Sequence, residues 1–452
     1  MPSLKTHKPQ HIAGDAPLQV KRRNRLANLL TEAAEIEHDV MAQYLFAAFS
    51  LKKAISEGGV NYAQLEELRG WATTMLLVAR QEMEHLGLVT NLLTAIGEAP
   101  NFRRPNFPIP ARTYPMNLPS SLDAFSPDVV LRFVCYEMPR RVNKKNRRYL
   151  EQYLPNFAPS QYDGIARTYL EIRELFHSIE AGDLFIGPPS AQFLSGGNSV
   201  VARGRIYPQK TTGKPPPIYD TELRPVTDLQ SANAVIEQII DEGEGADDDD
   251  PNSHFARFLD MHRQLMAETA KDPNFKPARA VLSNPRLASG DEGAAAATGI
   301  HYVTNPDTAQ VMELFDMAYS TMVLMLMRYF AHTDESDADL IGLQDTAFFP
   351  MMTVGIRPLG EILTQLPAQE PDAEWRAGPS FVLPLRLQLL PHRRSAWRVI
   401  LGELQMLTAK AEQAQKNQNF SPAVRERLTL LYENFARMTM NFQDAMHARK
   451  MQ

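Results

Sequence analysis

Two pairs of residues in this sequence have the spacing of a metal site carried on a helix. Glu82 and His85, and again Glu174 and His177, place a carboxylate three residues before an imidazole. Residues three apart lie on the same face of an α-helix, and metal sites inside helical bundles use this arrangement. The two pairs therefore predict that two helices present metal ligands to a shared interior.

The direction of each side chain shows whether the two residues of a pair lie on the apolar face of their helix. At about 100° per residue, Glu82 and His85 lie in the middle of an apolar stripe, whereas Glu84 points away from it. The second pair is less clear, because Glu171 lies only about 60° from Glu174 around the helix. Glu171 therefore remains a rival or additional ligand.

Two further helical segments each place one glutamate on an apolar stripe. Glu37 is the central carboxylate of the first segment, and Glu137 lies on the stripe of the third. Glu35 faces the opposite side from Glu37, so a third match to the spacing, Glu35 with His38, is interpreted as accidental.

The complete set is one glutamate from each of two helices and a Glu-x-x-His pair from each of two others. Its members are Glu37, Glu82, His85, Glu137, Glu174 and His177. This is the ligand set of carboxylate-bridged di-iron and di-manganese bundles. Four carboxylates buried among apolar side chains are very unfavourable without cations. We therefore expect two iron ions, with manganese or a mixed iron and manganese pair as the alternative, and partly exposed structural glutamates as the competing interpretation.

Two other residues carry groups suited to such a site. Tyr44 lies two helical turns after Glu37 on the same face, where its phenol is a candidate catalytic group that donates to a ligand or is oxidised. An ordinary core tyrosine is the alternative. His254 follows the acidic run 242–250 and begins an amphipathic segment. There we expect a capping or packing role more than contact with a metal or substrate.

The elements that position these residues follow from helical periodicity in the first 185 residues. Four helices are predicted, at residues 24–57, 62–97, 126–150 and 160–183. The connection between the second and third is rich in proline and is expected to be an extended crossover. One long crossover between two helical hairpins is a feature of ferritin-like bundles.

The expected fold class is all-α: a ferritin-like four-helix bundle, then a Pro/Gly-rich excursion and a second helical domain. The expected units are an N-terminal tail, the bundle, a linker, a helical extension and a C-terminal helical domain, at residues 1–23, 24–185, 186–227, 228–265 and 266–452. In the last unit, helices are predicted at residues 307–330, 351–366, 394–415 and 422–446. The Met-rich helix 307–330 is expected either to wall the metal site or to be plain interdomain core.

Composition limits the class of protein. The chain has 452 residues, 44% of them hydrophobic, and a net charge of −6, which describes a globular chain rather than a disordered one. No apolar stretch approaches the roughly 20 residues that cross a bilayer, and no apolar signal segment is visible, so we expect a cytoplasmic protein without a membrane partner. The single cysteine, Cys135, excludes an internal disulfide and thiolate-rich metal sites. The basic run 140–148 is interpreted as a solvated helix face, and no nucleic-acid partner is expected.

Several short segments carry a recognisable pattern, at residues 34–38, 81–97, 228–232, 243–245, 253–255, 358–360 and 378–381. The most specific is the run from Gln81 to Gly97, which contains Glu82-Met-Glu-His85. Together they resemble the ferritin-like family named after iminophenyl-pyruvate dimer synthases, which includes parts of bacterial violacein- and indolocarbazole-pathway enzymes. The resemblance implies a ferritin-like bundle and the oxidative processing or coupling of an amino-acid-derived imine.

The leading functional hypothesis is a non-haem di-iron oxidoreductase that activates O₂ to oxidise a small organic substrate, with an amino-acid-derived molecule as a candidate. A ferroxidase or other iron-handling protein is one alternative, and a non-catalytic, metal-stabilised binding module is another. The expected partners are therefore O₂ and a small molecule, and a homo-oligomer is left open.

Overall fold

The computed structural model describes residues 16–162, 164–192, 223–243, 250–288, 298–331, 335–343, 347, 350–369 and 374–448. This part of the chain is predominantly helical, which confirms the all-α class. Two short strands, β1 (Pro285–Leu287) and β2 (His301–Val303), pair in parallel. Among the described helices, none has the length and apolar character needed to cross a membrane.

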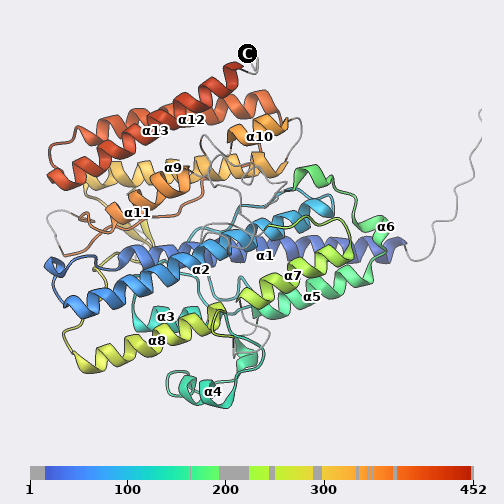
Figure 1. Ribbon diagram of the computed structural model, residues 1–452, viewed down its shortest axis with the longest axis horizontal. Helices are drawn as coiled ribbons and strands as arrows, with labels where there is room; N and C mark the ends of the chain where they lie inside the picture. The colour runs from blue at the N-terminus through green and yellow to red at the C-terminus, as the bar shows by residue number, and fades with distance from the viewer. Residues whose placement is uncertain are drawn as a thin grey trace, which may run out of the picture.

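Two long helices form the centre of the molecule. α1 (Ala16–Ser50) and α2 (Tyr62–Ala95) lie side by side as an antiparallel hairpin (Figure 1). α2 begins at a capping box, in which Asn61 Oδ1 accepts from the Gln64 amide at 3.0 Å and Gln64 Oε1 accepts from the Asn61 amide at 2.9 Å. Neither helix contains proline beyond its first turn, so both run uninterrupted past the middle of the bundle.

The third and fourth positions of the bundle are each filled by two shorter helices. These are α3 (Pro127–Tyr136), α5 (Gly164–Ser178), α7 (Leu229–Gly243) and α8 (His254–Lys271). α3 and α8 pack together over the half of the hairpin near its turn, and α5 and α7 cover the other half (Figure 1). Hydrogen bonds attach these shorter helices near both ends of α1. The Phe125 N–H, just before α3, donates to Ser50 Oγ at 2.9 Å, and Arg22 donates to the Ser178 carbonyl at the end of α5 at 2.9 Å.

Local sequence explains both interruptions. α3 ends at Tyr136 because Pro139 follows closely and cannot continue the helical hydrogen bonding. The excursion after it carries the short helix α4 (Lys144–Leu150), which projects from the bundle (Figure 1). α7 ends at Gly243, and α8 begins after Ser253, whose side chain caps its first turn.

This arrangement corrects the predicted bundle. A single helix at 126–150 is wrong, because the chain leaves the helical path after Tyr136. The helix predicted at 160–183 forms as α5, but it fills the second half of the third position. The fourth position is α7 and α8, from a segment that the sequence suggests as an extension outside the bundle. The predicted domain boundaries otherwise remain predictions.

The C-terminal half stacks further helical layers on the hairpin. Its helices are α9 (Pro306–Ala331), α10 (Asp337–Leu343), a π-helical turn (Met351–Ile356), α11 (Arg357–Leu363), α12 (Arg393–Gln415) and α13 (Pro422–Ala448). α12 and α13 form an outer hairpin, and α9 and α11 lie between it and α1 (Figure 1). Short turns lie at η1 (Ile55–Glu57), η2 (Pro159–Gln161), α6 (Ala181–Leu184) and η3 (Pro189–Ala191).

Candidate metal centre

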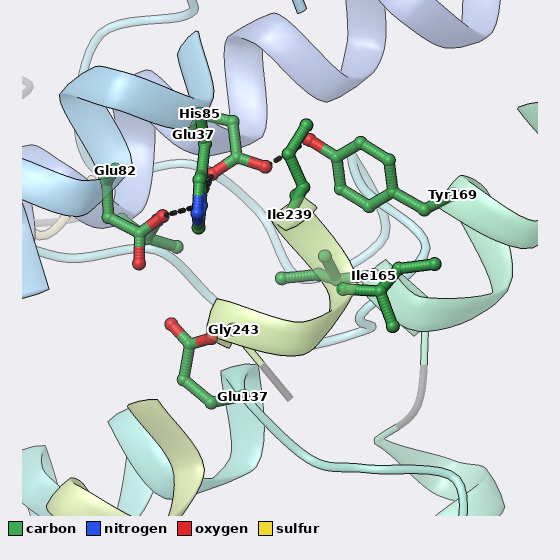
Figure 2. Close-up of a pocket in the computed structure, with 10 residues that line it drawn as sticks. Glu37, Glu82, His85, Glu137, Ile165, Tyr169, Ile239 and Gly243 are labelled. Atoms are coloured by element: carbon green, nitrogen blue, oxygen red, sulfur yellow. Dashed lines mark hydrogen bonds and ion pairs between the residues drawn. The ribbon is translucent and has the colours of Figure 1, made fainter. Parts of the chain in front are cut away.

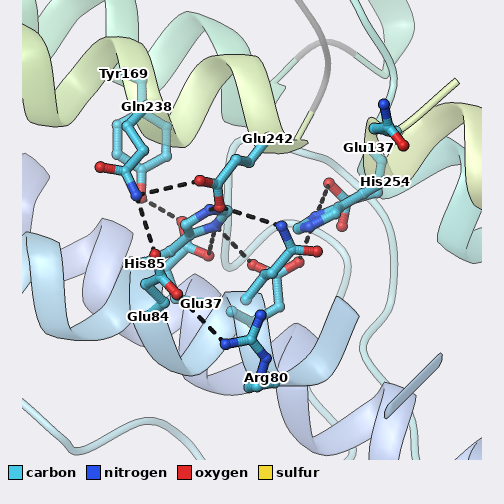
Figure 3. Close-up of polar contacts among 12 residues, drawn as sticks. Glu37, Arg80, Glu84, His85, Glu137, Tyr169, Gln238, Glu242 and His254 are labelled. Atoms are coloured by element: carbon cyan, nitrogen blue, oxygen red, sulfur yellow. Dashed lines mark hydrogen bonds and ion pairs between the residues drawn. The ribbon is translucent and has the colours of Figure 1, made fainter. Parts of the chain in front are cut away.

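Six side chains meet where the third and fourth positions of the bundle are interrupted (Figures 2 and 3). They are Glu37 of α1, Glu82 and His85 of α2, Glu137 at the C-cap of α3, Glu242 in the last turn of α7 and His254 at the start of α8. The continuous helices supply one half of the cluster, and helix ends supply the other. Glu137, Glu242 and His254 come from the ends of three different helices, so no helical spacing relates them along the sequence.

Glu82 lies between the two histidines. Its Oε2 is 3.0 Å from Nδ1 of His85, and its Oε1 is 2.9 Å from Nδ1 of His254. The two imidazole rings are stacked, with centroids 5.5 Å apart. One carboxylate thus faces two nitrogen donors through different oxygens, which is the arrangement of a bridging ligand.

Glu37 and Glu137 occupy equivalent places at the two ends of the cluster. Oε2 of Glu37 is 3.6 Å from Nδ1 of His85, and Oε2 of Glu137 is 3.6 Å from Nδ1 of His254. Within each group of three, Glu37 with Glu82 and His85 and Glu82 with Glu137 and His254, the candidate ligand atoms lie within 4.8 Å of one another. The cluster therefore offers two adjacent groups that could each hold an ion, and Glu82 belongs to both.

Two buried tyrosines hold the end carboxylates. Tyr169 of α5 donates its hydroxyl hydrogen to Oε1 of Glu37 (Figure 2), and Tyr44 of α1 donates to Oε1 of Glu137. Burial, reinforced by the charge of Glu137, raises the pKa of Tyr44 well above its ordinary value. The Tyr44 hydroxyl therefore keeps its proton and remains a donor.

Glu242 adds a fourth carboxylate on the side of His85. Its Oε2 lies 3.3 Å from Nε2 of His85 and accepts from Gln81 at 3.3 Å. Gln238 donates to Oε1 of Glu242 at 3.1 Å and to Glu84 at 3.0 Å (Figure 3). The Glu242 side chain is 27% exposed, so it forms the edge of the cluster. One ion position has four candidate ligands and the other has three.

Burial and like charge make this cluster unfavourable without cations. Glu37, Glu82 and Glu137 are each at most 5% exposed. Burial, with the nearby charge of Glu82, raises the pKa of Glu37 to about 7. Burial opposes the charged form of His254, but Glu82 and Glu137 outweigh it and raise its pKa to about 9. The site therefore attracts positive charge, which protons supply where no metal is bound.

The donors present fit transition-metal ions. Nδ1 of His254 lies 2.9 Å from Oε1 of Glu82, but neither atom has a hydrogen bond of regular geometry among the described residues, although both side chains are buried. Unpaired buried polar atoms are unfavourable, and a metal ion would satisfy them. Imidazole nitrogens combined with carboxylate oxygens suit iron and its neighbours. The C-termini of α3 and α7 also point their negative dipole ends here, against one N-terminus from α8.

A cavity of about 20 Å³ lies among the ligands. Besides Glu37, Glu82, His85 and Glu137, its lining comprises Val40, Ile165, Tyr169, Ile239, Ile240 and Gly243 (Figure 2). This volume holds about one water-sized molecule. α9 contributes nothing to this lining, and most of its methionines are buried, so it serves as core rather than as a wall of the cavity. Tyr319 of α9 instead contacts His38 of α1.

The structure brings together four of the six predicted ligands, namely Glu37, Glu82, His85 and Glu137. It does not bring Glu174 and His177 to the cluster, and their assignment is corrected. Both are exposed on α5, where Nε2 of His177 lies 3.1 Å from Nδ2 of Asn233. The buried face of α5 is formed by Tyr169, Ile172 and Phe176, so the predicted phase of this helix is wrong.

Glu171, which the spacing leaves open, and Glu84, which it places off the apolar stripe, both lie outside the ligand set. Glu171 forms an ion pair with Arg25 at 2.9 Å, away from the cluster. Glu84 points away from the ligands as predicted, yet it is 3% exposed and lies 4.0 Å from Arg80 beneath α7. Its burial comes from the packing of α7, which helical phase alone does not reveal.

Sequence reasoning missed Glu242 and Tyr169, and it ranked a capping or packing role for His254 above contact with a metal or substrate. Glu242 lies in the last turn of α7, and His254 begins α8. Together they offer the carboxylate and the imidazole that a Glu-x-x-His pair on one helix would offer, but the acidic run separates them in the sequence. The one signal was the Ser253 cap followed directly by a histidine. Nothing in the local sequence points to Tyr169, because its role depends on how α5 packs against α1.

Comparisons with known proteins agree with the ferritin-like fold. A family model described as ferritin-like matches residues 30–263, which include all six clustered residues. Dichlorochromopyrrolate synthase of Lentzea aerocolonigenes is 28% identical over 423 residues, which cover 87% of this chain and 39% of that protein. A 2-imino-3-(indol-3-yl)propanoate dimerase of Chromobacterium violaceum is 28% identical over 386 residues, which cover 79% of this chain and 35% of that protein. The chain therefore spans less than half the length of either relative, and both support the resemblance to iminophenyl-pyruvate dimer synthases.

A solved structure is also similar. The crystal structure of a ferritin-like protein from Caulobacter vibrioides aligns with a TM-score of 0.39 and 18% identity, over 71% of this chain and 93% of that one. This similarity is too low to carry a functional argument.

Proposed function

Because this chain belongs to the ferritin-like family, we propose that its six-residue cluster binds two iron ions and that the protein is an O₂-dependent oxidoreductase acting on a small organic substrate. The observation that best supports this proposal is the position of Glu82, whose two oxygens face two different histidines. Its relatives are named as a synthase and a dimerase, which supports an enzyme. Manganese, or a mixed pair, suits the same donors.

Each ion has its own set of proposed ligands. One set is Glu37, Glu82, His85 and Glu242, and the other is Glu82, Glu137 and His254. Two divalent ions would balance the four carboxylate charges, which removes the cost of burying them. When bound, an iron pair supplies the redox chemistry by which O₂ oxidises an organic molecule.

The protein's own side chains control what reaches the ions. The cavity of about 20 Å³ admits a molecule the size of O₂ but not an aromatic ring system. Val40 and Ile239 are buried in its wall and exclude water, whereas Ile165 and Ile240 are partly exposed, so we expect the mouth of the cavity beside them. We expect the organic substrate to approach at this mouth.

An amino-acid-derived imine or amine is the proposed substrate class. The Chromobacterium relative is named for the dimerisation of an imino acid that bears an indole ring. This chain spans only 35% of that protein, so the proposal covers the oxidation of such a molecule and does not include its dimerisation.

Iron oxidation without an organic substrate is a second candidate. The small cavity favours it, because ferrous iron and O₂ need far less space than an aromatic substrate. In that case the cluster would be a ferroxidase centre.

Anaerobic loading with Fe(II), followed by rapid mixing with O₂, tests both candidates. The proposed function predicts about two irons per chain, and O₂ consumption that rises when an indole-bearing imino acid is added. Consumption that depends on added Fe(II) and ignores the organic molecule would favour the ferroxidase. Less than one iron per chain would contradict the metal centre itself.

A further inference from the structure

Two phenols make matching contacts at opposite ends of the cluster. Tyr44 and Tyr169 come from different helices, α1 and α5, and are 0% and 2% exposed. Tyr44 donates to Oε1 of Glu137, and Tyr169 donates to Oε1 of Glu37. The same contact is therefore built twice, from unrelated parts of the chain.

The second oxygen of each end carboxylate has a different neighbour. Oε2 of Glu37 faces His85 at 3.6 Å, and Oε2 of Glu137 faces His254 at 3.6 Å. Each end carboxylate thus turns one oxygen to an ion position and the other to a phenol. Glu82, whose oxygens face two histidines, has no such phenol contact within the described part of the chain.

A carboxylate can bind a metal through one oxygen or through both. A hydrogen bond from a buried phenol to a charged carboxylate is strong, and it occupies one of the two lone pairs of that oxygen and competes with a second metal bond. An oxygen held in this way is withdrawn from the ion. The ion then keeps a coordination position that the carboxylate would otherwise fill.

We propose that Tyr44 and Tyr169 are positioning residues that hold Glu137 and Glu37 as one-oxygen ligands and so keep one coordination position open on each ion. This inference rests on the proposed two-ion site, and it concerns how the ligands bind rather than whether they bind. It assigns Tyr44 a role in shaping the site, in place of the oxidation considered from the sequence.

Cobalt(II) loading tests the inference without any turnover. Visible absorption of cobalt(II) weakens as its coordination number rises, and azide binds at an open position. Tyr44→Phe and Tyr169→Phe remove only the hydroxyl, so each should keep two cobalt ions, lose absorption intensity and bind azide about tenfold more weakly. The double variant should show both losses.

Tyr319→Phe is the matched control, because this tyrosine is equally buried but its hydroxyl contacts His38 and no proposed ligand. Spectra and azide affinities of the Tyr44 and Tyr169 variants that equal those of the control would overturn the inference while leaving the metal site intact. Loss of cobalt from these variants would also overturn it, since the phenols would then be needed for binding itself. A wild-type protein that binds no cobalt would defeat the proposed function and this inference together.

Discussion

Two histidines of α8 are both buried, yet they lie in regions of opposite character. His254, at the start of the helix, has Oε1 of Glu82 2.9 Å from its Nδ1. His262, about two turns later, has its Nδ1 2.7 Å from the hydroxyl of Tyr149. The guanidinium of Arg263 stacks over the same tyrosine ring at 4.7 Å, so this second region already contains a positive charge.

The pKa values of the two imidazoles shift in opposite directions for this reason. The carboxylates raise the pKa of His254 to about 9 despite its burial, whereas burial lowers the pKa of His262 to about 4, with Asp128 opposing this shift and Arg263 adding to it. His262 instead packs against Tyr149 and Tyr153 and helps to attach the α4 excursion to α8. Burial alone therefore does not identify a metal ligand, and the charge of the neighbours does.

Glu82→Ala should have the largest effect of any single change. It removes the carboxylate shared by both ion positions, so we expect both ions to be lost. Metal analysis after gel filtration measures this directly. A variant that retained two ions would show that Glu82 does not bridge.

His254→Ala and His262→Ala test the comparison itself. The first should lose one ion of two, because Glu82 and Glu137 would remain without their imidazole. The second should keep both ions but lower the free energy of unfolding by about 1 to 3 kcal/mol, since it removes a buried hydrogen bond and ring packing. Metal content and chemical denaturation of both variants provide the measurement. Equal metal loss in the two variants would contradict the claim that His254 binds an ion and His262 does not.

The free energy of unfolding should depend on pH in part through the protonation of His262. Between pH 6.5 and 4 the unfolded chain binds a proton at this residue and the folded chain does not, so stability falls as the pH is lowered through that window. The contribution is up to about 3 kcal/mol, given a pKa difference of about 2.5. Unfolding of metal-free wild type and His262→Gln at several pH values would isolate it, and parallel profiles for the two proteins would rule it out.

Glu174→Ala and His177→Ala should have the smallest effects. Both side chains are exposed on α5, away from the cluster, so each change should alter the free energy of unfolding by no more than about 0.5 kcal/mol. Metal content should stay at two ions per chain. Loss of metal from either variant would restore these residues as ligands and remove Glu242 and His254 from that role.

Sequence reasoning succeeded where a helix continues through the site. Glu37, Glu82 and His85 lie on the long helices α1 and α2, whose apolar stripes define an inward face over many turns. Glu137 was found in the same way, because α3 keeps its phase up to the residue that caps it. The proline-rich crossover and the helices α9, α12 and α13 also follow from local patterns.

It failed where two helix ends complete the site. Helical spacing relates residues only within one helix, so Glu242 and His254 have no periodic relation that could be detected. Glu174 and His177 have ideal spacing, but the packing of α5 is decided by Ile172 and Phe176 on another face. Which helix covers which half of α1 and α2 is a property of tertiary packing.

The distribution of the ligands also imposes an order on assembly. Glu37 and His254 are separated by roughly 200 residues, which a ribosome adds in roughly 10 to 40 s. Early in this interval, before α3 is made, the nascent chain contains Glu37, Glu82 and His85 on a hairpin that has no partner helices yet. Each proposed ion position is completed only near the end of this interval, because one set of candidate ligands also needs Glu242 and the other needs His254.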